Sequence, residues 1–108
     1  MNILGLSGSL RAASINSMLL RAIARLAPED INVSIFTGLG ELPLFNPDLD
    51  ARLPASVVAF HRAVADADAV LLASPEYAHG VTGTIKNALD WLVGFEPFAS
   101  KTAAVLNT

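Results

Sequence analysis

The fold is decided by the opening stretch MNILGLSGSLRAASIN, residues 1–16, where an apolar run meets a polar loop. The run from Asn2 to Leu6 is short and continuous, which is typical of a strand covered on both faces in a parallel sheet. The loop that follows, Ser7 to Ser14, carries serines, a glycine and an arginine and leads directly into a helix. A buried strand, a polar loop and a helix in this order predict the first unit of an α/β protein.

The same alternation continues along the chain. Short apolar runs read as strands, and apolar residues at helical spacing lie between them. Strands that alternate with single helices predict right-handed crossovers and one parallel sheet. The predicted strands are 2–6, 31–36, 69–73 and 101–106, with 31–36 near an edge, and the predicted helices are 15–26, 53–66 and 84–93.

The first helix has the clearest pattern in the chain. Ser14 is a plausible N-cap and Pro28 closes the segment. The apolar positions form one stripe at helical spacing, which predicts the face that packs on the sheet. The predicted buried face is Ile15, Met18, Leu19, Ala22, Ile23 and Leu26.

Length and composition limit the class of protein. A chain of 108 residues predicts a single domain, 1–108, and 53% hydrophobic with 16% charged residues excludes intrinsic disorder. A net charge of −3 argues against a nucleic-acid binder, and the absence of cysteine excludes thiol chemistry, so any redox centre must be a bound cofactor. No apolar run approaches the length of a membrane span, and the N-terminus is a poor signal peptide, so we expect a soluble cytoplasmic protein without a membrane partner.

Ligands of open parallel sheets bind beyond the carboxyl ends of the strands, so three loops are candidate sites: 7–14, 45–50 and 74–83. The first loop combines hydroxyls, an amide and the Arg11 guanidinium at a helix N-terminus, which suits a terminal phosphate. A polar turn in which Ser14 only caps the helix is the alternative. Dinucleotide and P-loop glycine spacings are absent, a phosphatase loop would need a cysteine, and a receiver domain would need acidic residues after the first and third strands.

The third loop joins the stiff Pro75 to a glycine-containing end, with Tyr77 between them. Such backbone can pass close to a flat ligand while the tyrosine stacks on it, so the loop could cradle an isoalloxazine ring. An ordinary loop with one exposed aromatic is the alternative. His79 could help to position a substrate or cofactor, but its pattern favours a solvated loop histidine. His61 has no second ligand at metal spacing, so no metal site is expected. Asn87 and Asp90 are interpreted as structural or interfacial, and Trp91 as a packing residue.

Together these motifs resemble the NADPH-dependent FMN reductase family of flavodoxin-like flavoproteins, which includes chromate, quinone and azo-dye reductases. The resemblance rests on GSLR at 8–11 with Ser14 and Asn16, on PEY at 75–77, and on Gly83 ahead of KNALDW at 86–91. It covers essentially the whole chain. It implies a three-layer α/β/α sandwich with a parallel sheet of order 2-1-3-4, lacking the family's fifth strand.

The resemblance also implies a site. The FMN phosphate would lie on the first loop, and the third loop would line the ring, with the loop at 44–49 near the flavin and the dimer contact. Members are typically homodimers or homotetramers with NAD(P)H as electron donor. The cofactor-binding residues implied are Ser9, Arg11, Ser14, Ile15, Asn16, Pro75, Glu76, Tyr77, Ala78, His79 and Gly80. No catalytic acid or base is nominated.

The leading hypothesis is an FMN-binding oxidoreductase that passes hydride from NAD(P)H through non-covalent FMN to a small-molecule acceptor. Quinones, azo compounds, metal oxyanions and free flavin are the acceptors considered. One alternative is a flavodoxin-like electron carrier without NAD(P)H activity. The other is an inactive truncated fragment, for which we expect weak FMN retention and self-association through the strand at 101–106, because an unprotected edge strand invites pairing.

Overall fold

Four parallel strands form one sheet in the order β2-β1-β3-β4, as predicted. The computed structural model describes residues 1–8, 15–74 and 83–107. β2 is an edge strand, and its alternating exposure agrees with the period-two pattern of its sequence. The strands are β1 (Asn2–Ser7), β2 (Asn32–Ile35), β3 (Ala69–Ser74) and β4 (Thr102–Asn107), each within two residues of its predicted bounds.

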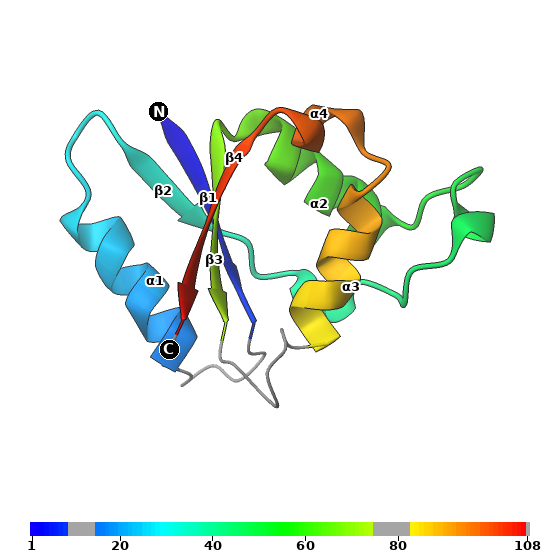
Figure 1. Ribbon diagram of the computed structural model, residues 1–108, viewed down its shortest axis with the longest axis horizontal. Helices are drawn as coiled ribbons and strands as arrows, with labels where there is room; N and C mark the ends of the chain where they lie inside the picture. The colour runs from blue at the N-terminus through cyan, green and yellow to red at the C-terminus, as the bar shows by residue number, and fades with distance from the viewer. Residues whose placement is uncertain (9–14, 75–82, 108) are drawn as a thin grey trace.

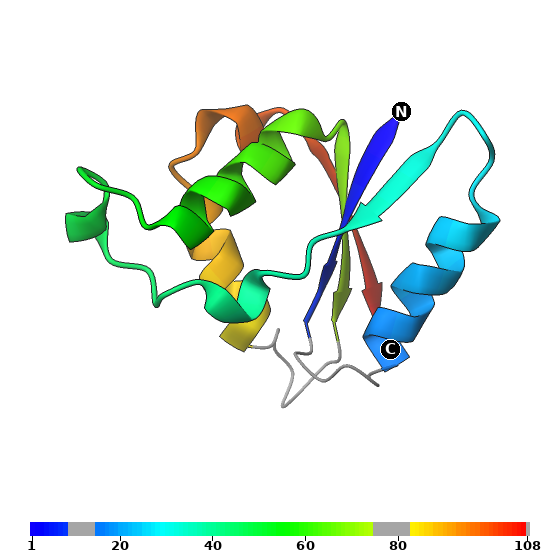
Figure 2. The same ribbon diagram turned by 180° about the vertical axis from the view of Figure 1, so that it is seen from behind.

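Helices cover the sheet unequally. Figures 1 and 2 show α1 (Ile15–Leu26) alone on one face, and α2 (Ala55–Asp66), α3 (Gly83–Leu92) and the short α4 (Glu96–Ala99) on the other. No helix in the described ranges is long and apolar enough to cross a membrane. α4 was not predicted, since four residues are too few to show a helical period.

The connection between β2 and α2 contains two 3-10 turns, η1 (Leu39–Glu41) and η2 (Pro47–Leu49). The connection ends at Pro54, which is the N-cap of α2, so the helix begins two residues later than predicted. The Pro54 carbonyl accepts hydrogen bonds from the N–H groups of Val57 and Val58. Figure 1 shows the segment around η2, in green at the right, extending away from the sheet.

The main hydrophobic core lies between the sheet and the α2/α3 layer. Leu4 and Leu6 of β1 alternate toward this layer, and Val70 and Leu72 of β3 are their neighbours in register. Every α-helical member of the core cluster belongs to α2 or α3, and Phe60 of α2 is fully buried. The helical residues of this cluster are Val57, Phe60, Val64, Ile85, Ala88, Trp91 and Leu92.

On the other face, the predicted buried stripe of α1 is wrong in part. Of the side chains described in this helix, 17–26, Leu20 alone is buried, although the stripe did not include it; Met18 is 49% exposed and Leu26 is 83% exposed. The cause lies in the sheet. A Cβ on Gly5 would lie 3.2 Å from Leu20 Cδ2, so the missing side chain of this glycine makes the recess that receives Leu20. The helix therefore presents Leu20 to the sheet instead of the centre of its predicted apolar stripe.

Candidate functional site

The carboxyl ends of β1 and β3 lie at the same level of the sheet. Ser7 pairs in register with Ala73, and the Gly8 N–H donates a hydrogen bond of 2.7 Å to the Ala73 carbonyl. Ser17, in the first turns of α1, donates from Oγ to the buried Ser7 Oγ at 3.2 Å. Because the two strands end together, the first and third candidate loops leave the sheet from adjacent positions.

Two helix N-termini point toward this edge. α1 begins at Ile15 and α3 at Gly83, and Figure 1 shows both starting at the end of the sheet where the strands finish. Neither helix has an acidic residue in its first turn. The dipole of a helix N-terminus favours a bound anion. The edge therefore has the electrostatics of a phosphate site, and the structure fits a phosphate-bearing cofactor.

Most residues implied as cofactor contacts lie outside the described ranges. Ile15 and Asn16 are the first two residues of α1, at the helix terminus just described. The cofactor-binding role of these two residues and of all the others stays a prediction, and the others lie outside the described ranges. They are Ser9, Arg11 and Ser14 of the first loop, and Pro75, Glu76, Tyr77, Ala78, His79 and Gly80 of the third.

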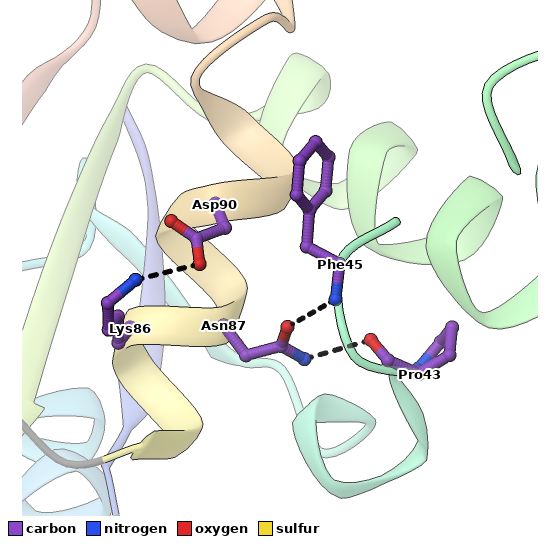
Figure 3. A network of polar contacts seen from close by, with 5 residues as sticks. All are labelled: Pro43, Phe45, Lys86, Asn87 and Asp90. Carbon is purple, nitrogen blue, oxygen red and sulfur yellow. Dashed lines mark hydrogen bonds and ion pairs between the residues drawn. The ribbon is translucent and has the colours of Figure 1, made fainter. Parts of the chain in front are cut away.

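The second candidate loop is fixed to α3 by the amide of Asn87 (Figure 3). Asn87 Oδ1 accepts a hydrogen bond of 2.8 Å from the Phe45 N–H, and Nδ2 donates one of 2.9 Å to the Pro43 carbonyl. Trp91 Nε1 donates to the same carbonyl at 2.8 Å. One side-chain amide thus both accepts a hydrogen bond from the backbone of this loop and donates one to it. These two bonds anchor the loop to α3, the helix that follows the third loop.

Asn87 and Trp91 are structural, as predicted, but their partners could not be found from the sequence. The bonded loop lies more than 40 positions away along the chain, and no local pattern joins the two segments. Asp90 is also structural in part, since its carboxylate pairs with Lys86 Nζ at 3.0 Å across one helical turn. His61 Nε2 lies 2.8 Å from the Trp91 carbonyl and must be the donor there, because a carbonyl only accepts.

A parallel sheet of order 2-1-3-4 with an anion-favouring carboxyl edge defines the class: it is a flavodoxin-like α/β protein. The sequence model of the NADPH-dependent FMN reductase family matches residues 1–108, so the chain belongs to that family. The predicted fold class and family are thereby confirmed.

Similar proteins agree with this assignment. A 2-hydroxy-1,4-benzoquinone reductase from a Burkholderia species is 40% identical over 104 residues, which cover 94% of this chain and 56% of that protein. The quinone reductase of Escherichia coli (strain K12) is 33% identical over 109 residues, which cover 97% of this chain and 58% of that protein. The structure of FerB, a flavoenzyme NAD(P)H:(acceptor) oxidoreductase from Paracoccus denitrificans, superposes with a TM-score of 0.88 at 35% identity, covering 98% of this chain and 59% of that one. The chain thus spans a little over half the length of the relatives it matches.

Proposed function

We propose that this chain is the FMN-binding part of an NAD(P)H-dependent oxidoreductase that reduces a small acceptor, a quinone in the first instance. The observation that carries the proposal is the aligned carboxyl edge of β1 and β3, near which α1 and α3 both begin without an acidic residue in their first turns. Family membership supports the cofactor, and the names of the relatives support the reaction.

In this proposal the first loop binds the FMN phosphate. The guanidinium of Arg11 and the hydroxyls of Ser9 and Ser14 supply donors beside the N-terminus of α1, where Ile15 and Asn16 begin the helix. The third loop lines the ring. Its proposed contacts are Pro75, Glu76, Tyr77, Ala78, His79 and Gly80.

When bound, FMN supplies the redox chemistry, accepting two electrons as hydride from NAD(P)H and passing them to the acceptor. The protein's own task is to bind and orient. The Asn87 amide contributes by holding the loop at 43–45 against α3. Because α3 follows the third candidate loop, this one helix connects the second and third loops.

Three further features belong to the proposal. The chain acts as one domain, 1–108, of a homodimer or homotetramer, which the family resemblance supports and light scattering would test. Azo compounds, metal oxyanions and free flavin are additional acceptors. The place of action is the cytoplasm, where NAD(P)H is supplied, and cell fractionation would test it.

The test is a titration of the purified chain with FMN, followed by flavin fluorescence, then anaerobic addition of NADPH and finally of 1,4-benzoquinone. We expect saturable quenching, bleaching of the bound flavin by NADPH and its recovery with the quinone. Arg11→Gln should weaken FMN binding about tenfold or more, because it removes a charge-assisted hydrogen bond. Arg25→Gln, at the other end of α1, is the matched control and should leave binding unchanged.

The outcomes separate the alternatives. Absence of quenching would contradict FMN binding by this chain. Saturable quenching without bleaching by NADPH would contradict the reductase and favour the electron carrier. Equal weakening by both arginine variants would show that α1 contributes only general charge and would overturn the assigned role of Arg11.

A further inference from the structure

One hydroxyl is buried at the carboxyl edge of the sheet, where the flavin site is proposed. It belongs to Ser7, the last residue of β1, which is 9% exposed and is the single buried polar residue in the described part of the chain. Burial of a hydroxyl costs free energy unless the group is hydrogen-bonded. One partner is the half-buried Ser17 of α1, whose Oγ donates to Ser7 Oγ at 3.2 Å. Two serine hydroxyls therefore meet between β1 and α1.

Stability alone does not require this pair. Replacing both partners of a buried hydrogen bond by apolar groups of the same shape can leave stability nearly unchanged. Alanine already occupies the position next to Ser7 in register, Ala73 of β3, which is fully buried. An alanine in α1 would also have a higher helix propensity than Ser17. Two serines at this contact therefore indicate a requirement for direction and not only for burial.

The pair joins the two ends of the first loop. Ser7 ends β1, and Ser17 is the third residue of α1, ten positions further along the chain. The residues between them include those that we propose to bind the phosphate. Next to Ser7, the Gly8 N–H donates at 2.7 Å to the Ala73 carbonyl of β3. The point where the loop leaves the sheet and the point where the helix begins are therefore both tied to the strands.

A second contact between α1 and β1 lies one helical turn further on, where Leu20 is fully buried over Gly5. Ser17 and Leu20 are three positions apart and so lie on one side of the helix. Gly5 and Ser7 are two positions apart and so lie on one face of the strand. The Leu20 contact holds the helix on the sheet without fixing a direction, because hydrophobic burial is non-directional. The hydrogen bond has a defined length and angle, so it sets the position of the helix N-terminus.

We infer that Ser7 and Ser17 are positioning residues of the proposed flavin site, which hold the N-terminus of α1 where it favours the phosphate of FMN. The attraction of a helix N-terminus for an anion falls off within the first turn, so a small displacement of the helix should weaken it. The inference rests on the proposed function and adds to it two residues that are not among the predicted cofactor contacts. Because they act through the helix terminus, they should affect binding of the phosphate and not of the ring.

The experiment compares FMN with riboflavin, which has the same ring system but no phosphate, in fluorescence titrations of the full chain. Ser17→Ala should weaken FMN binding about three- to tenfold, the factor expected for one hydrogen bond, and leave riboflavin binding within about twofold of the wild type. Inorganic phosphate, added as a competitor of FMN, carries the charged group without the ring, and its inhibition constant should rise by the same factor. Ser34→Ala, at an exposed position of β2, is the matched control and should bind both flavins as the wild type does.

Ser7→Ala separates positioning from direct contact with the ligand. Removal of either hydroxyl breaks the same hydrogen bond, so Ser7→Ala should match Ser17→Ala. The double variant should then weaken FMN binding no more than either single variant. Additive losses would show that Ser17 acts on the ligand by itself and would overturn the positioning role. Urea denaturation of each variant checks that it is folded under the conditions of the titration.

The failure of this inference and that of the proposed function give different results. Unchanged FMN binding in Ser17→Ala, or equal weakening of FMN and riboflavin, would overturn the inference and leave FMN binding by the chain intact. An unchanged inhibition constant for inorganic phosphate would do the same. Absence of FMN binding by the wild type would contradict the proposed function itself.

Discussion

The two faces of the sheet are built differently. On one face α2 and α3 bury Leu4, Leu6, Val70 and Leu72 in a continuous core. On the other, α1 lies alone, and of its described side chains only Leu20 is buried. Figure 2 shows the same contrast from behind, with α1 on one side of the sheet and α2, α3 and α4 on the other.

This difference shows that the two faces of a parallel sheet can contribute unequally to the free energy of unfolding. The core residues of the α2/α3 face are buried together, so each deletion there leaves a cavity that cannot easily collapse. On the α1 face, the described side chains of the helix bury one leucine over one glycine, and Met18 and Leu26 stay in solvent. The free energy of unfolding should therefore respond strongly to changes on the first face and at a single point on the second.

The largest effect is expected for Phe60→Ala. This ring is fully buried and meets Phe36 with centroids 5.2 Å apart, so its loss should lower the free energy of unfolding by about 3–5 kcal/mol. Urea denaturation would measure it, with Val58→Ala, a half-exposed position on the same helix, as the control. A loss below about 1 kcal/mol would contradict a tightly packed α2/α3 core.

Leu20→Ala tests the single buried point on the other face. We expect a loss of about 2–3 kcal/mol, at the lower end of the range for buried leucine, because the partly exposed neighbours leave room for the site to relax or admit water. Urea denaturation would again measure it. A loss as large as that for Phe60→Ala would show that the two faces are packed alike.

Gly5→Val should destabilise the protein by about 1–3 kcal/mol, because its methyl groups enter the space of the Leu20 side chain. In a Leu20→Ala background the same substitution should cost less, since that side chain is shortened. A double-mutant cycle measures this coupling, expected to exceed about 0.5 kcal/mol. Strictly additive effects would contradict the contact between Gly5 and Leu20.

The smallest effect is expected for Leu26→Gln, which should change the free energy of unfolding by less than about 0.5 kcal/mol because the side chain is exposed. The same leucine was predicted to be buried, so the variant compares the sequence pattern directly with the structure. Destabilisation comparable to that of Leu20→Ala would favour the sequence pattern.

Much of the fold and part of the site could be predicted. The order of strands and helices follows from periodicity and turn residues, because these act within a few positions of the chain. The assignment of a phosphate to the first loop rests on GSLR at 8–11 next to a helix start and stays a prediction. The hydrogen bonds of Asn87 and Trp91 to the second loop could not be found in this way, because their partners come from segments distant in the sequence.

The sequence by itself determined the alternation of strands and helices and the family, since backbone geometry and residue type act locally. Tertiary structure alone decided which side of α1 meets the sheet. Leu20 is buried because Gly5, on another element, leaves it a recess. It also decided that His61 stacks on Phe95 and that Phe45 packs edge to face on Trp91. A periodic pattern fixes that a helix has an apolar side, but the neighbouring surface determines which residues that side buries.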